Sequence, residues 1–190
     1  MQGLLTEQDL NRGQVQWLSL DQETGKLSYK GNLYPGIAGK LLGFDMHTFT
    51  FQNRPQPKID IYIGVGDEVF DIQLGLYGWL SWRTLNMFMT VIDKLEGGEN
   101  IMIRAGKQGD NYNLSVSING KYLKWSKTWE EAGFKGMDAN DQAYNRNKMI
   151  DKWIARLVDK MKFDANQAKE YHPETVGMVA DNVPFKSPEP

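Results

Sequence analysis

The amino-acid sequence predicts a mainly β fold with added helices, because its hydrophobic period changes twice along the chain. Residues 58–65 alternate apolar and polar side chains, which is typical of a half-buried strand. From 78 to 95 the apolar residues recur every three or four positions, which indicates an amphipathic helix. The period of two returns over 100–118. With 190 residues, 41% of them hydrophobic, the chain is long enough for one domain with its own core.

The first elements are expected to form a hairpin followed by a long strand. Residues 15–20 and 26–30 are β-like runs on either side of a turn-rich segment, which favours a hairpin. A loop rich in Gly and containing Pro, 31–40, is expected to lead into a long strand over 41–51. The proline-containing segment 52–57 is expected to connect that strand to the next one.

The central elements give the expected topology. Strands over 58–65 and 68–74 are joined by a tight turn, and the helix over 78–95 ends at a pair of glycines. Two more strands follow within 100–118, and Asn119-Gly120 is the strongest signal for a hairpin turn. Three strands, a helix and two strands are the element order of the OB fold, a five-stranded, partly open barrel. We therefore expect an OB-fold barrel with an added N-terminal hairpin and a C-terminal helix.

The C-terminal part divides into a helix and a tail. Apolar residues at helical spacing predict a helix over 141–162, whereas periodicity is lost after residue 163. The expected organisation is an OB-fold domain with its hairpin over 1–127 and a helical extension packing on it over 128–163. A flexible tail is expected over 164–190.

Composition argues against most enzyme classes. The chain has no cysteine and two histidines, His47 and His172, and it contains no phosphate-binding glycine loop, nucleophile elbow or zinc-binding signature. Carboxylates such as Asp60 and Asp71 are expected to be solvated residues on strand faces. The N-terminus lacks the pattern of a secretory signal, and no uninterrupted apolar run is long enough to span a membrane. We expect a cytoplasmic protein that is not an enzyme, with no cofactor, no metal and no membrane association.

Candidate binding residues are aromatic side chains interleaved with Lys and Arg. OB folds bind single strands by combining a cationic groove with aromatic faces on which bases stack. The formal net charge is −2, yet residues 79–127 hold seven basic and four acidic residues. Tyr62 is expected to face outward on its strand, although each aromatic residue has packing as its alternative role. The predicted nucleic-acid site comprises Phe49, Phe51, Arg54, Lys58, Tyr62, Arg104, Lys107, Lys121, Tyr122, Lys124 and Trp125.

The tail contains the sequence DNVPF, and its matching residues are Asp181, Val183, Pro184 and Phe185. This segment resembles the C-terminal tip of bacterial-type single-stranded DNA-binding proteins, although KSPEP follows it here. The body over 33–125 is similar in pattern to the divergent single-stranded DNA-binding proteins of bacteriophages. The resemblance implies an OB domain that binds DNA and a tail that recruits replication or repair proteins, in a bacterial or phage-infected cell.

Three hypotheses for function follow. The first is sequence-nonspecific binding of single-stranded DNA in replication or recombination. The second is an OB-fold protein-interaction or structural module of a phage assembly, without nucleic-acid binding. The third is an RNA-binding OB domain, which competition between DNA and RNA oligomers would separate from the first, because nothing in the sequence reads a 2′-hydroxyl. The sequence leaves the oligomeric state open, and a homo-oligomer is compatible with the amphipathic helix.

Overall fold

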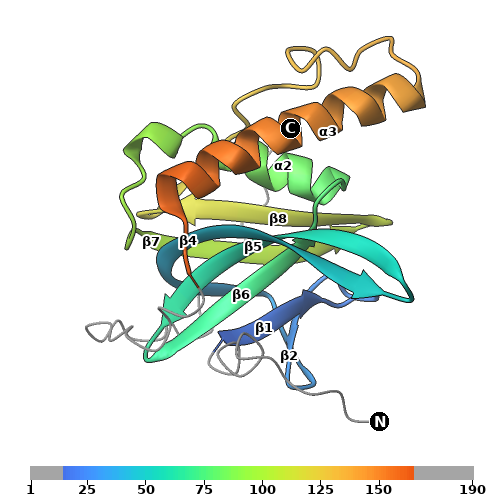
Figure 1. Cartoon of the computed structure of the whole chain (residues 1–190). Coiled ribbons are helices and arrows are strands. Elements are labelled where there is room, and N and C mark those ends of the chain that lie inside the picture. Colours follow the sequence, from blue (N-terminus) through green and yellow to red (C-terminus); the bar gives the residue numbers. More distant parts are fainter. Residues whose placement is uncertain (1–14, 165–190) are drawn as a thin grey trace.

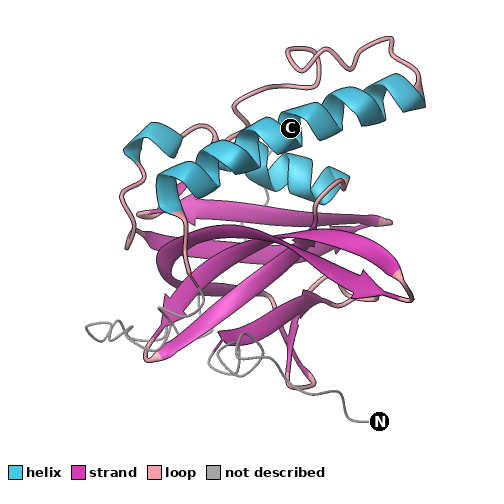
Figure 2. Ribbon diagram, in the orientation of Figure 1, coloured by secondary structure: helices cyan, strands magenta, loops and turns pink. Residues whose placement is uncertain are grey.

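The computed structural model describes residues 15–164, which form a mainly β structure with one nine-stranded mixed sheet (Figures 1 and 2). The spatial order of the strands is β3-β2-β1-β6-β5-β4-β7-β8-β9. The strands are β1 (Val15–Leu20), β2 (Leu27–Tyr29), β3 (Asn32–Tyr34), β4 (Gly36–Phe51), β5 (Arg54–Val65), β6 (Glu68–Gly75), β7 (Asn100–Gln108), β8 (Asn111–Ile118) and β9 (Lys121–Tyr122). The helices are α2 (Trp79–Phe88), the short 3₁₀ helix η2 (Ile92–Lys94) and α3 (Ala139–Met161).

The middle of the sheet is a Greek key. Strands β4, β5 and β6 are antiparallel neighbours, and β7 returns to lie beside β4, which gives the order fourth, first, second, third. The long strand β4 pairs with a different strand along each of its two parts. Its beginning, Gly36 to Lys40, pairs with β7, and its second part pairs with β5. A register shift between Leu41 and Gly43 marks the bend between the two parts.

The sheet does not close into a barrel. Within residues 15–164, β6 and β8 do not pair with each other, because β6 pairs with β5 and β1, and β8 pairs with β7 and β9. Helix α2 contacts both β6 and β8 and so lies across the space between these strands. The predicted five-stranded OB barrel is therefore not confirmed: the sheet is open between β6 and β8 and carries extra strands on both edges.

The N-terminal hairpin forms as expected, but it is built into the sheet. Strands β1 and β2 are antiparallel, and β1 also pairs in parallel with β6, placing Val15 opposite Val69. Part of the expected loop over 31–40 is strand. A Cβ atom at Gly36 would lie 2.5 Å from the carbonyl oxygen of Ile103. Glycine at this position permits the close approach of β7. The glycine that suggested a loop is therefore part of the pairing between β4 and β7.

Two further boundaries differ from expectation. Strand β5 begins at Arg54 and includes Pro55 and Pro57, because β6 joins it only from Lys58 onward. Proline is tolerated where a strand has a free edge, since it cannot donate a hydrogen bond there. Helix α2 ends at Phe88, and the buried residues that follow belong to η2.

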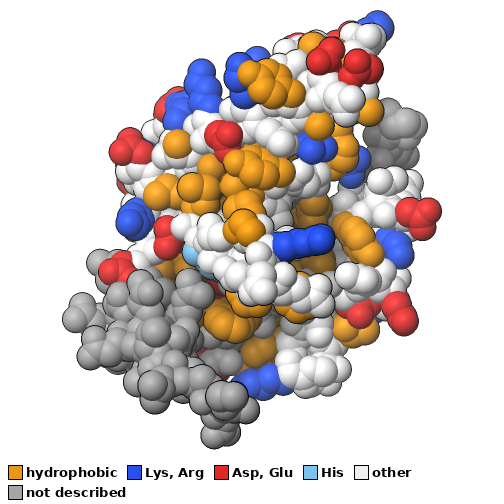
Figure 3. Space-filling view, turned by 45° about the vertical axis from the view of Figure 1, so that its right-hand side comes forward, with side chains coloured by type: hydrophobic (Ala, Val, Ile, Leu, Met, Phe, Trp, Pro, Cys, Tyr) orange, Lys and Arg blue, Asp and Glu red, His pale blue; other side chains and the backbone are white. Residues whose placement is uncertain are grey.

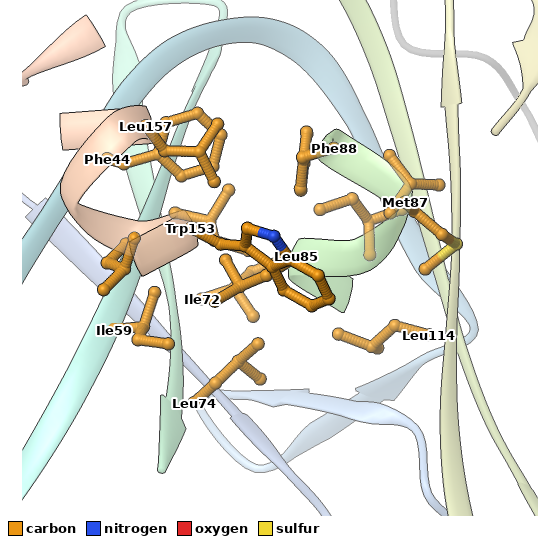
Figure 4. Close-up of a cluster of buried hydrophobic side chains, with 14 of the residues drawn as sticks. Phe44, Ile59, Ile72, Leu74, Leu85, Met87, Phe88, Leu114, Trp153 and Leu157 are labelled. Carbon is orange, nitrogen blue, oxygen red and sulfur yellow. The ribbon is translucent and has the colours of Figure 1, made fainter. Parts of the chain in front are cut away.

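Helices α2 and α3 lie over one side of the sheet and complete the core (Figures 1 and 4). Trp153 and Leu157 of α3 meet Leu85 and Phe88 of α2 above the inner side chains of the strands. Helix α3 begins at a capping residue, Asp138, whose carboxylate accepts the N–H groups of residues 140 and 141. Among residues 15–164, no helix has the length and hydropathy needed to cross a membrane.

Candidate nucleic-acid interface

One group of predicted residues gathers on the outer face of the β4–β5 hairpin. Alternate residues of a strand point to opposite sides of the sheet. Ile59 and Ile61 point into the core, so the residues at the alternating positions of β5, and their partners on β4, point outward. Phe49 and Phe51 lie on the outer side and are 52% and 57% exposed. Their cross-strand partners Gln56 and Arg54, with Lys58 further along, share that side. We call Phe49, Phe51, Arg54 and Lys58 the hairpin face.

The turn of this hairpin explains why these residues are adjacent. Gln52 and Asn53 both adopt positive φ, +48° and +60°. A two-residue turn with positive φ at both positions matches the twist of the flanking strands, and Asn tolerates this conformation well. The turn sets the register that places Phe51 opposite Arg54. Two aromatic rings and a guanidinium are thus presented together at the tip of the sheet.

The β7–β8 residues form a second group. The β4–β5 turn and the β7–β8 turn point to the same side of the molecule, the right of Figure 1. Lys107 is held in place: its ammonium donates to the carbonyl oxygen of Gln22 at 3.0 Å and lies 5.4 Å from the ring centroid of Tyr112. Arg104 is half-buried and lies against Gly36, where an added Cβ atom would be 3.3 Å from the Cγ of Arg104. Arg104 remains available to a ligand, whereas Lys107 already has a partner.

The predicted residues after β8 form a third group, far from the first two. Lys121 pairs with Ile118 at the end of β8 opposite to the β7–β8 turn, about 24 Å away along the strand. Tyr122 is 58% exposed, and Lys121 and Lys124 are also exposed. The ring of Trp125 packs 5.7 Å from that of the buried Trp82.

The next segment of chain is fixed to α2. The side-chain oxygen of the fully buried Asn86 accepts bonds from the Ser126 hydroxyl and the Lys127 N–H, at 2.7 and 2.9 Å. The Asn86 amide donates to the Lys127 carbonyl oxygen at 2.8 Å. The structure therefore attaches Trp125 to the helical side instead of bringing it to the hairpin face.

Tyr62 faces outward on its strand as expected, but it is not an exposed stacking face. Tyr62 is only 4% exposed, and its ring packs 4.7 Å from that of Phe163. The N–H of Phe163 donates to the carbonyl oxygen of Phe44 at 3.2 Å, so the chain leaving α3 crosses β4 at its bend. Gly43 permits this crossing, because a Cβ there would collide with the carbonyl oxygen of Met161.

An acidic cluster that sequence analysis missed lies beside Tyr62. Asp60 and Asp71 are 1% and 2% exposed, which corrects the expectation that both are solvated. Nδ1 of His47 lies 2.5 Å from Oδ2 of Asp60, and Gln73 donates to Asp71 at 2.9 Å. Burial, together with the nearby Asp60, raises the pKa of Asp71 to about 8. Asp71 therefore holds a proton at pH 7, and the cluster carries less negative charge than its composition suggests.

Among residues 15–164, no group of three or more His, Asp or Glu side chains is placed to hold a metal ion. No sequence signal marked the two carboxylates as buried, because the alternation of β5 and β6 assigns them to the polar side of each strand.

The predicted tail residues Asp181, Val183, Pro184 and Phe185 lie outside the described residues. On the described surface, the side shown in Figure 3 carries hydrophobic side chains with separate Lys and Arg side chains between them. No protein-family model, curated protein or solved structure matches this chain.

Proposed function

We propose that this protein binds single-stranded DNA without sequence preference, and that the hairpin face is the centre of its binding site. The observation that supports this most is the exposure of Phe49 and Phe51 side by side, next to Arg54. Stacking of one base on an aromatic side chain contributes about 1–3 kcal/mol, and every base has a face that can stack. The proposed role is in DNA replication or recombination in the cytoplasm, with the tail residues Asp181 to Phe185 contacting partner proteins.

An OB-type architecture supports the proposal at the level of topology. The Greek key of β4 to β7, with α2 before β7 and β8 after it, follows the element order of that fold. OB folds bind oligonucleotides near the loops between the first and second strands and between the fourth and fifth. In this chain those loops are the β4–β5 and β7–β8 turns, which point to the same side (Figure 1). We interpret the sheet as an OB barrel opened between β6 and β8.

The charges near the hairpin face predict a moderate dependence on salt. Arg54 and Lys58 on the hairpin face, together with the half-buried Arg104 of β7, are the basic residues that we propose meet phosphates. Each phosphate neutralised on a single strand contributes about −0.7 to the slope of log K against log salt concentration. Three such contacts give a slope of about −2, lower than that of strongly basic DNA-binding proteins.

Titration of labelled oligo-dT by fluorescence anisotropy tests the proposal. The double variant Phe49→Ala/Phe51→Ala is expected to bind at least tenfold more weakly, because two stacking faces are lost. Tyr144→Ala is the matched control, since Tyr144 is 61% exposed but lies on α3. The proposal fails if the wild-type protein does not bind at low salt, or if the double variant binds as tightly as the control.

A second candidate function is a protein-interaction or structural module of a phage assembly. The covering of Tyr62 by the protein's own Phe163 favours it, because one of the expected stacking faces is occupied. The same titration separates the two functions, because a structural module is not expected to bind oligo-dT. Competition between oligo-dT and oligo-rU in that assay tests RNA as the preferred ligand.

A further inference from the structure

A third large aromatic residue, Trp17, lies on the same side of the sheet as the hairpin face. Trp17 is 54% exposed, whereas its neighbour Leu18 belongs to the core. In the parallel register of β1 and β6, Trp17 is level with Asp71, and Asp71 is in turn opposite Tyr62. Val15, two residues before Trp17, packs with Tyr62 on the outer side of the sheet. Trp17 therefore points outward rather than packing the hairpin onto the core.

Polar and basic residues separate Trp17 from the hairpin face. A diagonal across the outer side leads from Trp17 past Gln73 on β6 and Lys58 on β5 to Phe49 on β4. Gln73 and Lys58 are both half-buried, and Gly75 opposite Lys58 leaves that position open. The area covered by Phe163 lies to one side of this diagonal. Phe163 packs on Tyr62, which is four residues further along β5 than Lys58, the residue where the diagonal crosses that strand.

The length of this diagonal matches a single strand of a few nucleotides. Strands β1, β6, β5 and β4 are successive neighbours, so three strand spacings amount to about 14 Å across the sheet. Phe49 lies six residues along β4 from Gly43, the partner of Tyr62, which adds about 20 Å along the strand. The path is therefore about 25 Å long, and OB folds cover about 4–16 nucleotides.

We propose that Trp17 is a base-stacking residue, and that single-stranded DNA crosses the outer side of the sheet from the β4–β5 turn to β1. This inference rests on the proposed function and extends it to a strand outside the five of an OB barrel. The ligand chemistry follows from the arrangement, because aromatic faces at both ends of the path, with Gln73 and Lys58 between them and Arg54 beside Phe51, fit bases joined by charged phosphates.

The nearby acids do not oppose a phosphate backbone strongly. Asp71 lies directly beside Trp17 in register, but it is buried and holds its proton at neutral pH. Asp60 is buried against His47. Arg54 is exposed and Lys58 is half-buried, and both are complementary to DNA, whereas Asp45 on β4 is a half-buried acid opposite Asp60, to one side of the diagonal.

The test compares wild type, Trp17→Ala and Trp17→Phe over oligo-dT lengths from about 2 to about 16 nucleotides. The shortest oligomers fit on the hairpin face alone, so all three proteins are expected to bind them equally. Beyond the length that reaches β1, Trp17→Ala is expected to bind about tenfold more weakly than wild type. Trp17→Phe keeps a stacking ring and is expected to retain most of the affinity, while losing most of the DNA-induced quenching of tryptophan fluorescence.

Each other outcome overturns one of the two proposals. If Trp17→Ala matches wild type at every length while Phe49→Ala/Phe51→Ala binds weakly, the role of Trp17 is wrong and the hairpin face stands. If wild type does not bind any oligomer, the proposed function itself is wrong. If Trp17→Ala changes the molar mass in solution and leaves DNA affinity intact, this side of the sheet contacts a second copy of the chain. Unchanged far-UV circular dichroism shows that the variants fold.

Discussion

Replacement of Asp71 by Asn tests how the buried acidic cluster controls stability. The folded protein holds the Asp71 proton up to a pH of about 8, whereas an unfolded aspartate releases it near pH 3.8. Unfolding therefore releases a proton between these two pH values. The free energy of unfolding should fall as the pH rises from about 4 to about 8 and then level off. The stability contributed by this group is greatest in acid and is lost toward alkaline pH.

The size of the effect follows from the shift in pKa. One pKa unit corresponds to about 1.4 kcal/mol, so the full shift gives an upper limit of about 6 kcal/mol. The charges of Asp60 and His47 act on Asp71 in opposite directions, and we expect this interaction to reduce the loss to about 2–4 kcal/mol. Asparagine keeps an oxygen for the bond from Gln73 and supplies an N–H in place of the carboxyl proton. Asp71→Asn should match wild type only below about pH 4, gain on it as the pH rises toward 8, and exceed its stability by about 2–4 kcal/mol at pH 9.

The measurement is urea unfolding followed by circular dichroism from pH 5 to pH 9, for wild type, Asp71→Asn and Glu68→Gln. Glu68 lies on the same strand but is exposed, so its substitution should leave the pH profile unchanged. The contribution of other titrating groups largely cancels in the difference between variant and wild type. A difference that stays constant over this pH range, or a variant that is less stable at pH 9, would refute the reasoning.

Two further substitutions test how distant segments are attached. Gly43→Ala places a Cβ against the Met161 carbonyl oxygen at a φ of +154°, and should lower the free energy of unfolding by about 2–4 kcal/mol. Gly75→Ala, with nothing within 4 Å of its Cβ, is the control in urea unfolding, and equal losses would contradict the close approach at Gly43. Asn86→Ala removes three hydrogen bonds and should cost about 2–4 kcal/mol. In that variant, hydrogen exchange at Lys127 should accelerate, and unchanged protection there would show that Asn86 does not hold the segment.

The elements could be predicted from the sequence because their signals are local. The alternation over β5 and the helical spacing in α3 each lie within a short window; α3 forms close to its expected bounds, and β5 ends where expected but starts four residues earlier. The hairpin of β1 and β2 was predictable for the same reason. Propensity and period therefore locate most of the secondary structure of this chain.

The parts that could not be predicted depend on residues far apart in the sequence. Alternation assigns Tyr62 to the outer side of β5 correctly, but only the position of Phe163 determines that this side is covered. The burial of Asp60 and Asp71 likewise arises from neighbouring strands and from segments that cross them. Of the predicted site, Phe49, Phe51 and Arg54 stay together because a two-residue turn connects them, whereas Trp125 is held elsewhere by Asn86.

The parallel pairing of β1 with β6 has a consequence for how this chain folds. Val15 and its partner Val69 are 54 positions apart, so β1 emerges from the ribosome long before the strand it must join. Closing a loop of that length costs about 3.5 kcal/mol in chain entropy, and contacts at such separation slow folding. Until β1 arrives, one edge of β6 has unpaired N–H and C=O groups that another chain could pair with. Aggregation during refolding should therefore rise with protein concentration and fall once this edge is closed.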